Sequence, residues 1–145
     1  MLDSPESSYW AAPPAFPNAA GWLVSTIDDF WPFVRLLLNG GTHDGRRILS
    51  EASARRMVTD QLAGAAPFLD DGTSWGLGLA VPAAGASPGA MPRGFGWDGG
   101  TGTTWRSDPR TGLTGILFTQ RSMISPAPPQ AFTDFWRTAD DCLAG

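Results

Sequence analysis

The chain has 145 residues, of which 42% are hydrophobic and 17% charged, with 18 glycines and 13 prolines. This composition is typical of one globular, loop-rich domain with a modest core. The net charge of -4, without a basic patch, argues against a nucleic-acid partner, and no apolar run is long enough to span a membrane. One cysteine, Cys142, excludes an internal disulfide, and together with one histidine it is too little for a zinc site. We therefore expect no metal and no cofactor.

The first residues show no targeting signal. The segment Met1–Glu6 has neither the basic flank nor the apolar run of a signal peptide. A cytoplasmic location is the default expectation, and the compartment of a longer parent protein stays open. Residues 1–20 are polar and then proline-rich, which predicts an extended lead-in to a folded part at 21–145.

Two helices are predicted in the first half. Thr26 is the expected N-cap of a helix over residues 27–38, with Asp28-Asp29 in its first turn. Capping explains these two aspartates better than an acid pair for catalysis does. A second helix is expected to begin after Ser50 and to run to about Gln61.

A tight turn is predicted between these helices, with Asp44-Gly45 at its tip. His43, the only histidine, precedes it and has two interpretations. It is either a general base or an exposed side chain in a turn, and the second is favoured because no nucleophile is in view.

Three antiparallel strands are predicted in the second half. They are Trp75–Val81, a glycine-rich strand from Gly94 that continues to Ser107, and Leu113–Gln120 after a turn at Asp108–Gly112. A last helix follows at about residue 130. The predicted fold class is therefore α+β, with a three-stranded antiparallel sheet and helices. Only the terminal helix is clearly available to cover this sheet, so its outer edge and second face are expected to need partners.

The segment Gly94–Trp105 has the most unusual composition, because five of its twelve residues are glycine. An ordinary core strand does not keep so many glycines, since each costs entropy and leaves no side chain to pack. Two interpretations remain open. The segment is either a strand rim where a ligand approaches the backbone, or a glycine-rich hairpin loop without a site.

Five segments follow one another in an order and spacing known from one protein family. They are Gly21–Asp29, Leu36–Gly41, Asp44–Ser50, Trp75–Gly78, and Gly96–Gly100 with Asp108-Pro109 after it. Together they resemble the serine beta-lactamase/penicillin-binding superfamily, and most nearly its class C beta-lactamase-like carboxylesterases. The resemblance implies the C-terminal portion of a beta-lactamase/transpeptidase-like fold.

The segment around Trp97 resembles the third motif of that family, which is Lys-Thr-Gly in lactamases and His-x-Gly or Trp-x-Gly in related esterases. By this resemblance Trp97 takes the lysine position, Asp98 the threonine position and Gly99 the glycine position. The backbone N–H of Gly100 would then form half of an oxyanion hole, and Thr101 would join the first three in binding substrate. Tryptophan removes the cation that would hold a beta-lactam carboxylate, and Asp98 adds a negative charge if it faces the cleft. The resemblance thus favours a neutral ester or amide.

The other two motifs of the family are missing. Its nucleophile motif, Ser-x-x-Lys, cannot occur because the chain contains no lysine. Its second motif is Tyr-x-Asn or Ser-x-Asn, and the only tyrosine, Tyr9, is followed by Trp10 and Ala11 rather than by x-Asn. Both motifs precede the resembling segments in the family. The resemblance therefore implies the C-terminal part of a serine hydrolase that forms an acyl-enzyme. We expect this chain to be inactive alone and to need the missing N-terminal half as its partner for a small ester or amide substrate.

Two further interpretations stay open. In one, the chain is a stand-alone binding module in which Trp97, alone or with Trp105, binds an acyl group, a peptidoglycan stem or a sugar face. In the other, it is a structural domain in which a second copy covers the unpaired sheet edge. The tryptophans that fit an apolar period are expected in the core: Trp22, Trp31, Trp75 and Trp136.

Overall fold

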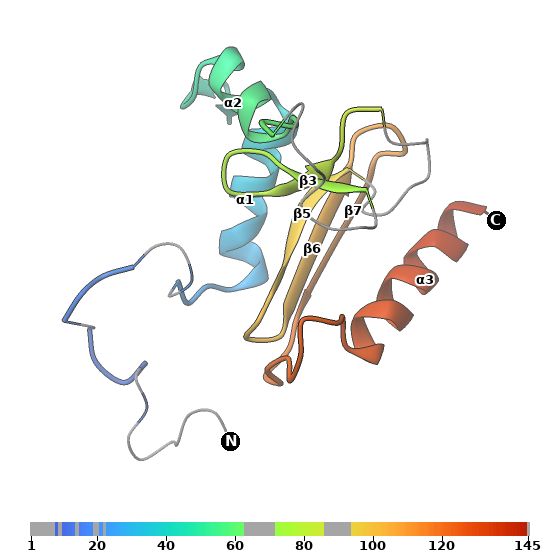
Figure 1. Cartoon of the computed structure of the whole chain (residues 1–145). Coiled ribbons are helices and arrows are strands. Elements are labelled where there is room, and N and C mark those ends of the chain that lie inside the picture. The colour runs from blue at the N-terminus through green and yellow to red at the C-terminus, as the bar shows by residue number, and fades with distance from the viewer. Residues whose placement is uncertain are drawn as a thin grey trace.

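The computed structural model describes residues 8, 10–13, 15–18, 21, 23–62, 72–85 and 94–144. Its elements are α1 (Ile27–Leu38), β1 (Thr42–His43), β2 (Arg46–Arg47), α2 (Glu51–Met57), β3 (Thr73–Trp75), β4 (Ala80–Pro82), β5 (Phe95–Gly99), β6 (Thr103–Asp108), β7 (Leu113–Phe118) and α3 (Gln130–Ala144). An antiparallel sheet lies between α1 and α3 (Figure 1). The predicted α+β class is confirmed.

Capping and glycine set the ends of α1 as predicted. The Thr26 hydroxyl oxygen accepts a 3.1 Å hydrogen bond from the backbone N–H of Asp29, which satisfies one of the unpaired donors of the first turn. The helix ends at Leu38. Gly40 and Gly41 follow with φ angles of +58° and +90°, which turn the chain away from the helix axis at little cost.

The connection between α1 and α2 contains a hairpin, in which a two-residue turn joins β1 to β2. Asp44 and Gly45 have φ angles of +46° and +75°, as a tight turn between the paired strands β1 and β2 requires. The Ser50 hydroxyl oxygen then accepts a 3.0 Å hydrogen bond from the N–H of Ser53 and caps α2. The predicted turn and the predicted cap are both confirmed.

The predicted end of α2 near Gln61 is wrong, because the helix stops at Met57. The carbonyl oxygen of Met57 accepts a 3.2 Å hydrogen bond from the N–H of Leu77, and the N–H of Gln61 donates to Trp75 at 2.8 Å. The backbone groups of this segment therefore form hydrogen bonds with residues at and after β3, and these bonds replace those of a further helical turn.

The sheet has five strands in the order β3-β4-β5-β6-β7, whereas three were predicted. Two of the predicted strands are in fact hairpins. The prediction for Trp75–Val81 divides into β3 and β4 around Gly78, and the glycine-rich prediction divides into β5 and β6 before Gly102. Both glycines are left-handed, with φ angles of +85° and +96°, so the chain reverses where an extended strand was expected. The third predicted strand is β7.

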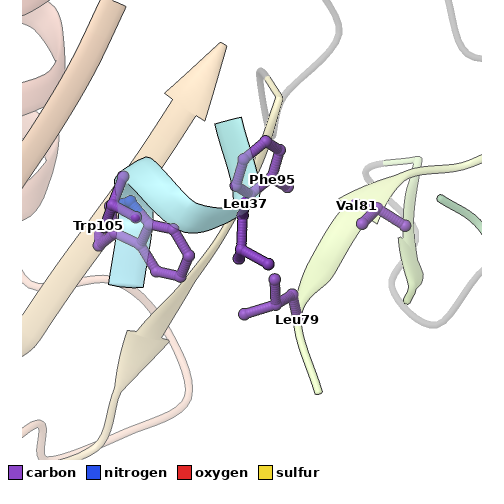
Figure 2. Close-up of a cluster of buried hydrophobic side chains, with 6 residues drawn as sticks. Leu37, Leu79, Val81, Phe95 and Trp105 are labelled. Atoms are coloured by element: carbon purple, nitrogen blue, oxygen red, sulfur yellow. The ribbon is translucent and has the colours of Figure 1, made fainter. Parts of the chain in front are cut away.

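The main core lies between α1 and one face of the sheet. Its buried residues, drawn in Figure 2, are Val34, Leu37, Leu79, Val81, Phe95 and Trp105. Phe30 of α1 meets Trp105 edge to face, with ring centroids 5.1 Å apart. The expectation that the terminal helix alone covers the sheet is therefore wrong, because α1 packs on one of its faces.

The other face of the sheet carries α3. Trp136 Nε1 donates a 2.9 Å hydrogen bond to the hydroxyl oxygen of Thr104 in β6. A Cβ at Gly115 of β7 would lie only 2.7 Å from the Trp136 ring, so glycine at this position makes room for the indole. Close approach and a hydrogen bond together hold α3 on the sheet.

The described residues of the lead-in, 8, 10–13 and 15–18, belong to no helix or strand. The division of the chain into 1–20 and 21–145 stays a prediction. Tyr9, Trp22 and the segments 63–71 and 86–93 lie outside the described residues.

Candidate functional site

The structure places all five predicted site residues in one hairpin. Trp97, Asp98 and Gly99 lie in β5, and Gly100 and Thr101 lie in the turn that leads to β6. This turn is closed by a 2.9 Å hydrogen bond to the Gly99 carbonyl oxygen from the N–H three residues later. The glycine-rich segment is therefore a hairpin, and the state of its edges decides whether it can also receive a ligand.

β5 is fully paired on one side only. On the β6 side all five residues are in register, from Phe95↔Ser107 to Gly99↔Thr103, whereas on the β4 side the one pair is Ala80↔Gly96. Within the described ranges, the β4 side of β5 is therefore open from residue 97 to its end. An open strand edge offers backbone donors and acceptors to another molecule.

Backbone groups of Asp98 are available at this open edge, and so is the N–H of Gly100 in the turn that follows, whereas the Gly100 carbonyl accepts a 2.9 Å hydrogen bond from the N–H of Met123. The Gly99 carbonyl points into the hairpin, and directions alternate along a strand, so the N–H and C=O of Asp98 point to the open side. The N–H of Gly100 donates to none of the described residues. A Cβ at Gly100 would meet nothing within 4 Å, so a ligand can come close to the backbone there.

The Asp98 side chain belongs to a network on the α3 side of the sheet. Its Oδ1 accepts a 2.6 Å hydrogen bond from Thr104, and its Oδ2 lies 3.3 Å from the guanidinium of Arg106. Thr104 also accepts the hydrogen bond from Trp136 of α3. The side chains of Asp98 and Arg106 are only 19% and 14% exposed, so each neutralises the other away from bulk water. Asp98 therefore does not present an unpaired negative charge at the open edge.

Trp97 leaves β5 in a different direction and is 42% exposed. Its indole meets that of Trp75 edge to face, with ring centroids 4.7 Å apart and planes at 88°. Trp31 was expected in the core but is exposed, whereas Trp105, considered as a binding residue, is buried. Among the tryptophans described, Trp97 and Trp75 are thus the pair beside the open edge.

Other chemistry-bearing side chains lie elsewhere in the fold. His43 of β1 is half-buried rather than exposed, and its Nε2 lies 3.4 Å from the carboxylate of Asp44. The carboxylate of Asp29 accepts a hydrogen bond from the Thr26 hydroxyl at the start of α1, so it belongs to the capped first turn. Among the described residues, no three His, Cys, Asp or Glu side chains gather where they could hold a metal ion. The described helices also include none that is long and apolar enough to cross a bilayer.

One carboxylate fastens the strands that carry the Trp75 side of the site. Asp60 accepts hydrogen bonds from the hydroxyl of Ser74 and from the N–H groups of Leu62 and Ala84. These hydrogen bonds hold the pKa of Asp60 below its ordinary value, and the bond from Ser74 has the largest effect. The ionised carboxylate thereby ties β3 and the end of β4 to the segment after α2.

Comparison with known proteins supports the resemblance to the beta-lactamase superfamily. A family model described as Beta-lactamase matches residues 2–132. The chain belongs to the beta-lactamase family. Two curated relatives, Uncharacterized protein MT1414 and Protein Rv1367c from two strains of Mycobacterium tuberculosis, are each 44% identical over 70% of this chain. The match spans only 28% of the length of each relative.

Membership of the beta-lactamase family agrees with the antiparallel sheet between helices. It leaves the substrate and the individual site residues open, and the roles of Trp97, Asp98, Gly99, Gly100 and Thr101 stay predictions.

Sequence reasoning missed the neighbours that orient two of these residues. Thr104 and Arg106 hold Asp98, and Trp75 lies against Trp97. A signal for the first two was present, because recognising the turn would have placed Thr104 directly opposite Asp98. No comparable local signal predicted the Trp75 contact.

Proposed function

We propose that this chain is the C-terminal part of a serine hydrolase that cleaves a neutral ester or amide through an acyl-enzyme. The open β4 side of β5, in the segment that resembles the family's third motif, is the observation that carries this proposal. In this role β5 forms one wall of the cleft. The N–H of Gly100 is one of two donors that stabilise the oxyanion of the tetrahedral intermediate.

The nucleophile comes from a second polypeptide segment. The chain has no lysine and therefore no Ser-x-x-Lys motif, so none of its serines has the activating base of the family. The relatives are more than three times as long as the part that matches, which supports a complementing segment outside the matched part. Exposed apolar residues on and before α1, such as Leu23 and Val24 at 78% and 77%, support an additional layer over this surface.

The charge at β5 favours a neutral substrate. By the resemblance to the third motif, Trp97 takes the position of the lactamase lysine, so the cation that would attract a carboxylate is absent there. The nearby carboxylate of Asp98 is bound by Arg106 and Thr104 and does not repel or attract a ligand strongly. An uncharged acyl group therefore meets no opposing charge from these residues.

Complementation tests the proposal, with the oxyanion donor removed in a controlled way. The chain is co-expressed with the N-terminal part of a beta-lactamase family protein that carries Ser-x-x-Lys, and hydrolysis of a p-nitrophenyl ester is measured. Gly100→Pro removes the N–H at the second position of the turn, where proline fits sterically. We expect it to lower kcat by about 10²- to 10³-fold, whereas Gly100→Ala keeps the N–H and should stay close to the unmodified chain.

Two results would contradict the proposal. Equal activity of the proline and alanine variants would remove Gly100 from the oxyanion hole. No esterase activity with any complementing segment that forms a stable complex would remove the hydrolase function itself.

A stand-alone binding module is the second candidate function, because Trp97 is exposed beside an open strand edge. Binding of an acyl compound by this chain at full affinity, unchanged on complementation, would favour the module over the hydrolase. A structural dimer is the third candidate, in which a second copy covers a sheet edge, and a monomer in sedimentation would exclude it.

A further inference from the structure

The contact between Trp75 and Trp97 joins two strands that are not neighbours. β3 and β5 are separated by β4, yet their two indoles meet with centroids 4.7 Å apart. Trp75 pairs with Ala80, and Ala80 pairs with Gly96, the residue that precedes Trp97 in β5. The two residues that separate the tryptophans in the sheet are therefore small.

The contact between the two indoles lies where β4 stops pairing with β5. Ala80↔Gly96 is the single pair between these strands, and Trp97 is the next residue along β5. The indole pair therefore lies beside the start of the open edge, and the backbone of Asp98 and Gly100 follows directly. A molecule whose carbonyl lies at that edge would have its neighbouring groups within reach of the indoles.

The chemistry of this neighbourhood suits an apolar group. An edge-to-face pair presents aromatic surface to solvent, and Trp97 keeps 42% of its surface exposed despite the contact. The charged residue that follows it, Asp98, is bound by Arg106 on the α3 side. Exposed indole surface without an adjacent free charge binds aliphatic or aromatic groups in preference to ions.

We propose that Trp75 and Trp97 together form a subsite for the apolar acyl chain of the substrate, which makes Trp75 a specificity-determining residue. Placement of the ester carbonyl at the open edge rests on the proposed hydrolase function, but binding of the acyl chain does not require a nucleophile. Each methylene that the indoles cover should strengthen binding about fourfold. The gain should stop once the chain extends past the pair.

The subsite can be tested on this chain alone with neutral, non-reactive probes. The N-methylamides of butanoic, hexanoic and octanoic acid are titrated against the 15N-labelled chain, and the indole Nε1–H signals are followed by NMR. We expect the signals of Trp75 and Trp97 to shift, affinity to rise by about tenfold or more from butanoic to hexanoic amide, and hexanoate to bind more weakly than its amide.

Matched variants separate this subsite from general hydrophobic binding. Trp31→Ala removes a tryptophan of similar exposure on α1 and should leave the titration unchanged. Trp97→Ala should weaken hexanoic amide binding by at least about tenfold. Trp97→Lys, a second variant that places a long side chain there, should reverse the preference between amide and carboxylate.

Several outcomes would overturn the subsite. They are an affinity independent of chain length, shifts that survive Trp97→Ala in a folded protein, and an equal loss in Trp31→Ala. The proposed hydrolase function fails separately. Amide binding without esterase activity on complementation would retain the subsite and reject the hydrolase, whereas esterase activity insensitive to acyl length and to Trp97 would do the reverse.

Discussion

Replacing Gly96 by alanine should separate β5 from β6. A Cβ at this position would lie 1.9 Å from the carbonyl oxygen of Trp105 and 2.9 Å from the Cα of Arg106. Both are backbone atoms, which cannot rotate away as the end of a side chain can. Because ordinary contact begins at 3.4 Å, the strands would have to move apart by about 1.5 Å.

The expected cost follows from the hydrogen bonds that such a movement breaks. Leaving a buried backbone donor or acceptor unpaired costs about 1–3 kcal/mol, and a broken bond leaves one of each. We therefore expect Gly96→Ala to lower the free energy of unfolding by about 3–4 kcal/mol, with the strain of overpacking included. With a urea m-value of about 2 kcal/mol/M, the midpoint should fall by about 1.5–2 M.

Equilibrium unfolding in urea, followed by far-UV circular dichroism and tryptophan fluorescence, measures this change. Gly100→Ala is the matched control in the same hairpin, because its new methyl group would meet nothing within 4 Å. It should change the free energy of unfolding by less than about 0.5 kcal/mol. Equal midpoints for the two variants would refute the argument that close strand approach requires glycine at 96.

Three further predictions concern local contacts and are checked by the same unfolding measurement. Thr26→Ala removes the N-cap of α1 and should cost about 1 kcal/mol; an unchanged midpoint would contradict the capping role. Thr104→Val removes the hydroxyl between Asp98 and the indole of α3 and should cost about 2 kcal/mol, and a stabilised variant would show that the network is dispensable. Burial raises the pKa of Asp108, but hydrogen bonds from the backbone and guanidinium of Arg110 and its charge outweigh burial and lower it overall. Stability from Asp108 is therefore present above its unfolded pKa of about 3.9 and is lost as the pH falls through the lower folded pKa, so Asp108→Asn should flatten that acid decline.

Two of these variants have close controls within the chain. Ser25→Ala removes an exposed hydroxyl whose hydrogen bond goes only to the adjacent carbonyl, so it should cost less than Thr26→Ala. Thr133→Val makes the same chemical change as Thr104→Val at an exposed position of α3. A similar loss in both threonine variants would assign the effect to valine itself rather than to the network.

Local signals predicted the ends of elements where the responsible side chain lies within a few residues. The caps at Thr26 and Ser50 and the turn at Asp44-Gly45 depend only on neighbours in the chain, and all three are confirmed. The end of α2 depends on Leu77, twenty residues beyond Met57, and no local pattern could have predicted it. The five-stranded sheet was missed for a different reason, because alternation of large and small residues around Gly78 does not distinguish one strand from a tight hairpin.

In the candidate site, too, local features could be predicted from the sequence and features set by strand pairing could not. The positions of Trp97, Asp98 and Gly99 on a strand followed from the family resemblance and the glycine pattern, and the structure places them on β5. The direction of the Asp98 side chain and its partner Arg106 depended on the register between β5 and β6, which a shift of one residue would reverse. A strand rim was one of the two interpretations of this segment, but the part of β5 that stays open could not be predicted, since it depends on where β4 ends relative to β5.

An exposed apolar stripe beside the core face of α1 gives the strongest structural argument that further protein covers this chain. Ile27, Trp31 and Leu38, at spacings of four and seven, share one side of the helix, and all three are exposed. Val34, between them on the same side, is fully buried, so this stripe borders the core directly. An apolar stripe that widens the core face of a helix is typically buried against another layer. The same stripe would serve a complementing segment or a second copy, and only the complementing segment would also bring a nucleophile to the open edge of β5.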